Sequence, residues 1–255
     1  MSRYGYRYGR QAAQRPVGYR DLAFYLSQGL PQAANQFDPL NGASPFRMLG
    51  NGPDPTLTVN GGQPAGDCGF VMTVNANIVT SAALGEAFTV PSSDEVVTDY
   101  LRYDHGQDVG VANAQLLPFW RKVGLWGNKI KGSGGVNFRD FDEAMAYNQA
   151  FLGLCTGIFV SEADEDATAN GEPWDYTGSA ANQNILGGHD VYVFGRADAD
   201  TVILGTWGQR QLATRRWWAQ QVEECDAVVT AELAQKGADT LGLDVESLEA
   251  DLARQ

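Results

Sequence analysis

Two stretches of the sequence, about half the chain apart, decide the fold. They read Gly62-Gln63-Pro64-Ala65-Gly66-Asp67-Cys68-Gly69-Phe70 and Leu186-Gly187-Gly188-His189-Asp190-Val191-Tyr192-Val193-Phe194-Gly195. The first places a cysteine at the head of small and apolar residues with helical spacing, which predicts a buried helix beginning at Cys68. The second has the composition of a buried strand, with His189 near its start. A thiol before a helix and an imidazole on a strand indicate nucleophilic chemistry.

The chemistry requires a thiolate at Cys68. A helix N-terminus and an adjacent imidazolium both lower the pKa of a thiol, and His189 would supply the second. The amide of Gln63, together with the Cys68 backbone N–H, could donate to a developing oxyanion. We therefore predict Cys68, His189 and Gln63 as catalytic residues. We expect no cofactor and no metal ion, because two histidines and dispersed cysteines do not form a cluster of metal ligands.

The pattern along the chain predicts helices in the first half and strands in the second. Helices are expected at 21–36, 69–84, 94–103, 112–123 and 140–150, and strands at 152–160, 188–196 and 201–206. Residues 162–172 are interpreted as an acidic loop. Residues 215–231 fit either a strand or a helix, and the tail after them is expected to be helical. Helices followed by strands predict the α+β class, with the thiol on a helical half and the histidine on a sheet half.

These motifs resemble those of the papain-like superfamily of cysteine peptidases. Gln63 and Asp67-Cys68-Gly69 are similar to the Gln and Asp-Cys-Gly block of the bacteriocin-leader-processing peptidases. Gly187-Gly188-His189 and Gly205-Thr206-Trp207-Gly208 are similar to the Gly-His and Asn-Ser-Trp-Gly blocks of the papain and cathepsin type. The resemblance covers roughly residues 60–215 and implies two lobes, a helical lobe carrying the cysteine and an antiparallel β lobe carrying the histidine. It also implies a peptidase or amidase that uses a Cys-His pair.

The sequence departs from this family where an Asn or Asp orients the histidine, because Gly205 occupies that position. Four residues could take over the role, namely Asp190, Asp198, Asp200 and Thr206. Strand alternation places Asp190 on the face opposite His189.

The chain is expected to have three parts: a basic arm with a short helix (1–36), the papain-like domain (37–222) and an acidic, mainly helical extension (223–255). Residues 1–20 contain five arginines and no acid, so they carry +5 of a net charge of −13 and leave −18 for the rest. An acidic body argues against specific nucleic-acid binding. An arm of arginine and tyrosine is typical of interfaces, which predicts contacts with copies of the chain or with other assembly subunits.

Two functions fit these features. The first is a papain-like thiol hydrolase that cleaves a peptide substrate. The alternative is a non-enzymatic head or tail component of a tailed virus, built on a degenerate peptidase scaffold and assembling through residues 1–20. The sequence has no apolar stretch long enough to span a membrane and no signal-peptide core, so a cytoplasmic or virion location is expected.

Overall fold

The computed structural model describes residues 8–12, 21–41, 58–59 and 63–254. Within them, a six-stranded antiparallel sheet has the order β3-β8-β4-β5-β6-β7. Its strands are β3 (Ile130–Gly135), β4 (Leu154–Ser161), β5 (Ile185–Asp198), β6 (Thr201–Thr206), β7 (Gln209–Thr214) and β8 (Val222–Thr230). A separate two-stranded ladder pairs β1 (Thr58–Val59) with β2 (Gln63–Pro64). The helices are η1 (Leu22–Tyr25), α1 (Cys68–Leu84), α2 (Ser93–Tyr103), α3 (Asn113–Lys122), α4 (Phe141–Phe151), α5 (Glu162–Asn170), α6 (Ala180–Gln183), α7 (Arg215–Gln221), α8 (Ala231–Leu241) and α9 (Val245–Leu252).

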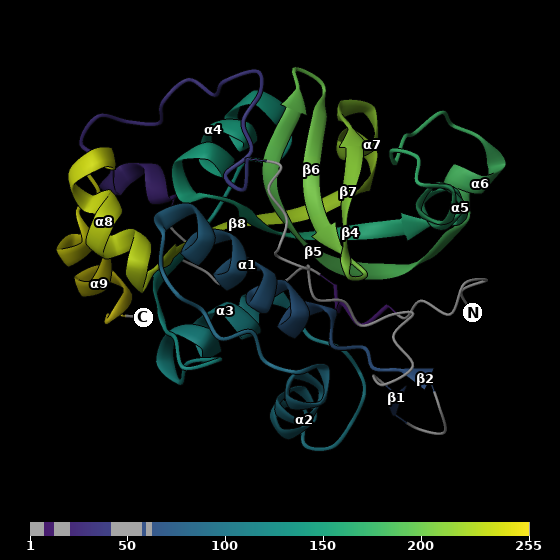
Figure 1. Ribbon diagram of the computed structural model, residues 1–255, viewed down its shortest axis with the longest axis horizontal. Coiled ribbons are helices and arrows are strands. Elements are labelled where there is room, and N and C mark those ends of the chain that lie inside the picture. The colour runs from purple at the N-terminus through teal and green to yellow at the C-terminus, as the bar shows by residue number, and fades with distance from the viewer. Residues whose placement is uncertain (1–7, 13–20, 42–57, 60–62, 255) are drawn as a thin grey trace.

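Helix α1 begins at Cys68, as the sequence predicts, and lies between the sheet and helices α2 and α3 (Figure 1). Every residue from Cys68 to Ser81 is buried, so the helix has no solvent face. Two of its polar side chains bond within the protein: Asn77 Nδ2 donates to the Thr73 carbonyl, and Trp126 Nε1 donates to Thr73 Oγ1, both at 2.9 Å. Gly85 ends the helix in the left-handed conformation (φ +68°).

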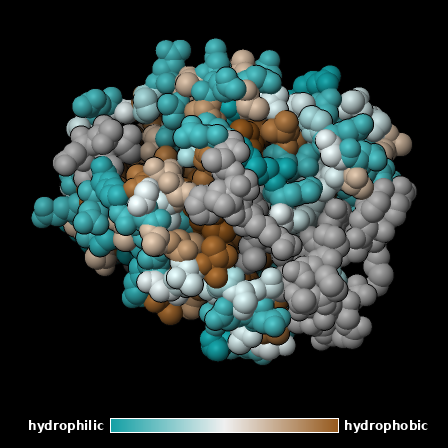
Figure 2. Space-filling view, in the orientation of Figure 1, coloured by the Kyte–Doolittle hydropathy of each residue, from teal (hydrophilic) through white to brown (hydrophobic). Residues whose placement is uncertain are grey.

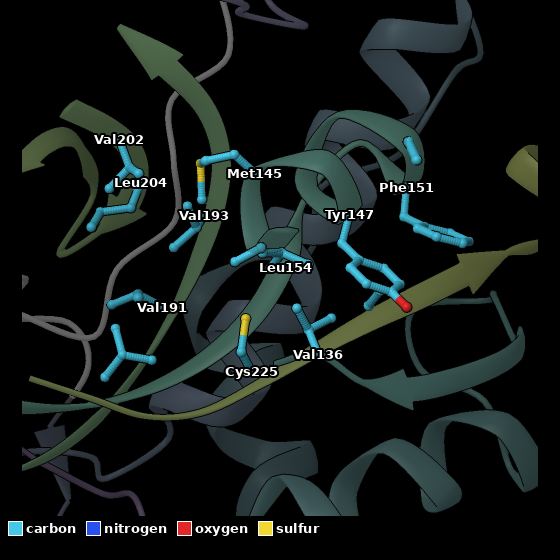
Figure 3. Close-up of a cluster of buried hydrophobic side chains, with 14 of the residues drawn as sticks. Val136, Met145, Tyr147, Phe151, Leu154, Val191, Val193, Val202, Leu204 and Cys225 are labelled. Carbon is cyan, nitrogen blue, oxygen red and sulfur yellow. The ribbon is translucent and has the colours of Figure 1, made fainter. Parts of the chain in front are cut away.

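The sheet is covered on both faces, and alternate residues of β5 enter different cores. Tyr192 and Phe194 pack with α1. Val191 and Val193 face the other way, into a core with residues of α4 and β8 (Figure 3). The same alternation places the side chains of His189 and Asp190 on opposite faces.

Two expectations about the elements are wrong, and two strands are new. The acidic loop expected at 162–172 contains α5, because Ser161 and Asp164 form a capping box that starts a helix there. The helix expected at 21–36 is only the 3-10 turn η1. Strands β3 and β7 were not expected. Residues 215–231, which the sequence fits to either a strand or a helix, form α7 followed by β8.

Strand β8 lies between β3 and β4, so residues 223–230 of the predicted extension are part of the sheet, and α8 and α9 follow them. Helix α9 packs on β3 and on η1, and Leu26 forms a β-bridge with Leu243. In the space-filling view, hydrophilic side chains surround hydrophobic ones gathered toward the middle of the face (Figure 2). Among the described helices, none has the length and apolar character needed to cross a membrane.

Candidate functional site

Residues 8–12, which we call the inner arm, pass between the segment that precedes α3 and strand β5. On the helical side, Val111 N donates to the Gly9 carbonyl and Gln11 N donates to the Val111 carbonyl, both at 2.8 Å. On the sheet side, Arg10 N donates to the Gly188 carbonyl at 3.3 Å. The inner arm is therefore held by main-chain hydrogen bonds on both sides, to Val111 and to Gly188.

Glycines make room for the inner arm. A Cβ on Gly9 would lie 1.8 Å from the Gly66 carbonyl oxygen, and one on Gly110 would lie 1.5 Å from the Gly9 carbonyl oxygen. A Cβ on Gly187 would lie 2.6 Å from that of Tyr8. Hydrogen bonds hold the backbone of both Gly66 and Gly110 in place. Gly66 N donates to Asp108 Oδ1, and Gly110 N donates to the Tyr100 hydroxyl, both at 2.8 Å. Only a residue without a side chain fits at position 9.

Cys68 lies at the first turn of α1 and is fully buried. Its Sγ donates to Asp190 Oδ2 at 3.8 Å. Burial and the carboxyl of Asp190 raise the pKa of the thiol well above its ordinary value, although the backbone N–H groups of Asp190 and Gly9 act in the opposite direction. In this conformation Cys68 is therefore a thiol and not a thiolate.

Asp190 belongs to a charged cluster around Arg10. The Arg10 guanidinium lies 3.0 Å from Glu224 Oε1 and 2.5 Å from Glu223 Oε2, and Arg10 Nε lies 3.6 Å from Asp190 Oδ1. The Arg10 side chain is only 1% exposed. Burial raises the pKa of Asp190 to about 8; Arg10 opposes this shift and Glu224 adds to it. Sequence reasoning missed this cluster, and the basic composition of the arm was the one signal for it.

His189 lies in an aromatic environment on the other face of β5. Its ring stacks on Trp207, with centroids 5.1 Å apart, and the Tyr8 ring approaches it edge-on at 6.4 Å. Its Nε2 lies 2.7 Å from Thr206 Oγ1, and its buried Nδ1 has no hydrogen-bond partner within the described part of the chain. Burial lowers the pKa of the imidazole to about 3, so the ring is neutral. Of the four residues proposed to orient His189, Thr206 is the one that contacts it.

The predicted catalytic residues are placed as follows. Cys68 and His189 both lie beside the inner arm, but in the described residues no hydrogen bond joins the sulfur to the ring. Gln63 lies in β2, opposite Val59, and its side chain is outside the description. The pairing of Cys68 with His189 and the role of Gln63 stay predictions. No group of three or more His, Cys, Asp or Glu side chains in the described residues is arranged to hold a metal ion.

Comparisons with known proteins support the fold. No family model matches the chain, and no curated protein matches it by sequence. Among solved structures, the chain is similar to xylellain, a cysteine protease from Xylella fastidiosa, with a TM-score of 0.64 over 89% of this chain and 97% of that chain. The two sequences are 14% identical, so the likeness is one of fold. It confirms the predicted α+β class and papain-like fold.

Proposed function

We propose that the protein is a papain-like thiol hydrolase of peptide or amide bonds whose nucleophile is covered by the inner arm. The observation that carries the proposal is the position of Cys68, at the N-terminus of a buried helix and against the strand that bears His189, in a fold shared with a cysteine protease. A helix N-terminus favours a thiolate once water reaches the sulfur.

The proposed reaction follows from these positions. The sulfur of Cys68 attacks the substrate carbonyl carbon, and the thiol proton passes to His189 and then to the leaving amine; water then hydrolyses the thioester. In this structure His189 and Asp190 lie on opposite faces of β5 and the sulfur contacts Asp190, so the imidazole must turn toward the sulfur once the inner arm has left. Thr206 engages Nε2, which leaves Nδ1 as the nitrogen that would exchange protons with the sulfur. The Cys68 backbone N–H and the Gln63 amide would stabilise the oxyanion.

Covering by the inner arm explains why the reactive groups are neutral in this structure. Burial is the largest cause of both pKa shifts: it raises the pKa of the Cys68 thiol and lowers that of the His189 imidazole. Displacing Tyr8 and Gly9 would admit water and reverse both shifts. A substrate would take the place of the same residues, so binding and activation would be one event.

The test compares iodoacetamide labelling of the native full-length chain with that of full-length Gly9→Val, in which the new side chain would collide with the Gly66 carbonyl. We expect Cys68 to react slowly in the native chain and at least about tenfold faster in Gly9→Val at neutral pH, because a solvated thiol has a much larger thiolate fraction. Cys155 and Cys225, whose thiols are both buried, are internal controls read by mass spectrometry of the same sample.

Peptide hydrolysis completes the test. Gly9→Val should hydrolyse a mixture of unstructured peptides, and adding Cys68→Ala or His189→Gln should abolish this activity, whereas adding Cys155→Ala should not. Labelling of Cys68 no faster than of Cys155, or hydrolysis that survives Cys68→Ala, would contradict the proposal.

The alternative of a virus-particle component stays a prediction. The described part of the predicted arm, residues 8–12, lies on the chain's own body, and residues 1–7 and 13–20 lie outside the described residues. Light scattering on the full chain and on a chain lacking residues 1–7 would decide whether this part of the arm joins subunits. A mass that is the same for both would count against assembly through these residues.

A further inference from the structure

We propose that the site occupied by the inner arm recognises extended peptides in which glycine is followed by arginine, with the arginine side chain held by Asp190, Glu223 and Glu224. This inference rests on the proposed function in one respect: such a peptide would be the substrate class presented to Cys68. The binding itself is independent of turnover.

The first argument is charge. A single guanidinium lies among three carboxyl groups, two of which belong to residues that are nearly fully buried, Asp190 and Glu224. Without a cation these groups would face one another in a region that water scarcely reaches, which is costly. The environment is therefore built for a positive charge, and Arg10 shows where that charge lies.

The second argument is shape, which favours arginine over lysine. Arg10 Nε and Nη2 both donate to Glu224 Oε1, at 3.1 and 3.0 Å, while Nη1 donates to Glu223. A planar group with several fixed donors can satisfy this arrangement, and a single ammonium cannot. Gly157 makes space for the guanidinium, because a Cβ there would lie 2.1 Å from Arg10 Nε.

The third argument concerns the residue before the arginine. Position 9 lies between Gly66 and Gly110 and accepts no side chain, and its backbone N–H acts on the Cys68 thiol. A bound peptide must therefore present glycine beside the sulfur. One residue earlier, Tyr8 donates a hydrogen bond from its hydroxyl to Glu165 and lies edge-on to His189, so an aromatic side chain fits there.

The fourth argument is that another chain can make the same contacts. The hydrogen bonds of the inner arm to Val111 and Gly188 are between main-chain groups, which any extended peptide carries. The net charge of −18 on the protein outside residues 1–20 attracts basic peptides.

The binding experiment uses full-length Gly9→Val, whose own arm cannot reseat, and the peptide acetyl-Tyr-Gly-Arg-Gln-amide. Its matched controls carry citrulline, which has nearly the same shape without the charge, or lysine in place of arginine. We expect the arginine peptide to bind about tenfold to a hundredfold more tightly than the citrulline peptide by calorimetry. Adding Glu224→Gln should remove most of this difference. Equal affinity for the arginine and citrulline peptides would overturn the proposal.

A second measurement covers the case in which Gly9→Val does not fold. In full-length Arg10→Ala, the guanidinium is missing but the acids remain. Millimolar ethylguanidinium should raise the melting temperature of Arg10→Ala and leave that of the native chain unchanged, while ethylammonium should act more weakly. If ethylguanidinium raised the melting temperature of Arg10→Ala no more than that of the native chain, the proposal would be overturned.

The outcomes separate this proposal from the proposed function. Arginine-dependent binding without hydrolysis would keep the recognition site and reject the hydrolase. Hydrolysis of peptides by Cys68 with no preference for glycine followed by arginine would keep the hydrolase and reject the recognition site.

Discussion

His189 and Asp190 are neighbours on β5, yet they lie in opposite kinds of environment. His189 faces Trp207, Tyr8 and the hydroxyl of Thr206, whereas Asp190 faces Cys68 and the Arg10 cluster. One side is aromatic and neutral, and the other is ionic. The pleat of the strand separates them, since successive side chains point to opposite faces of a sheet.

Both environments depend on the same short segment. Tyr8 covers His189, and Arg10 pairs with Asp190, so the inner arm completes the two sides at once. Burial then acts with opposite sign on the two groups, because it disfavours the charged form of each: the pKa of His189 falls and that of Asp190 rises. By excluding water, the inner arm favours the uncharged form of both side chains, although Arg10 opposes this effect at Asp190.

The ionic side should be the more sensitive of the two. Replacing Arg10 with Ala leaves buried carboxyl groups without their cation, which should lower the free energy of unfolding by about 3–5 kcal/mol. Urea denaturation measures this loss. Arg102→Ala is the matched control, because its ion pair with Asp99 is exposed and should contribute about 1 kcal/mol or less. Equal losses for the two variants would show that burial of Arg10 has no energetic consequence.

On the aromatic side, Thr206→Val removes the hydrogen-bond partner of His189 Nε2 while keeping the shape of the side chain. The buried ring nitrogen is then unsatisfied, and the free energy of unfolding should fall by about 1–3 kcal/mol. Thr201→Val, at the start of the same strand, is the control and should change little. A Thr206→Val chain as stable as the native one would mean that the contact with Thr206 does not hold the ring.

The pH dependence of stability distinguishes the two sides by sign. Because the pKa of Asp190 is raised to about 8, the native state keeps a proton that the unfolded state loses above about pH 4, so stability falls as pH rises toward 8. Because the pKa of His189 is lowered to about 3, stability falls as pH drops from about 6.5 toward 3.

Melting temperatures measured between pH 3 and pH 8 test this. Asp190→Asn should flatten the curve above about pH 6.5, where the unfolded-state histidine no longer titrates. His189→Gln should flatten its acidic limb. We expect these slope changes to be smaller than the effects of Arg10→Ala and Thr206→Val. An unchanged slope above pH 6.5 in Asp190→Asn would show that Asp190 is ionised in the native protein.

Much of the fold could be predicted because its elements carry local signals. Helix α1 begins at Cys68 where small apolar residues take up helical spacing, and the tail that is expected to be helical contains α8 and α9. Strand β3 could not be predicted, since Lys131 to Gly135 has almost no β-forming side chains and is a strand only through its pairing with β8. Helix α5 was missed because its acids suggested a solvated loop, although Asp164 accepts hydrogen bonds from Ser161 and Trp217.

The contacts around Cys68 and His189 could be predicted only in part. Strand alternation correctly separated Asp190 from His189, and Thr206 was among the expected partners of the ring. Residues 223–255 are predicted to form an acidic, mainly helical extension, yet Glu224 lies in β8 and is buried against Arg10. No local sequence pattern predicts the ion pair between Arg10 and Glu224, because the two residues meet only when the chain has folded.

The ion pair between Arg10 and Glu224 spans 214 residues of sequence. During synthesis the inner arm leaves the ribosome before its acidic partners, which arrive only when β5 and β8 have been made. Contacts of such long range close late, because the entropy of the intervening loop opposes them until the rest is ordered. We therefore expect the inner arm to dock after β5 and β8 have paired into the sheet, so that Cys68 stays uncovered until then.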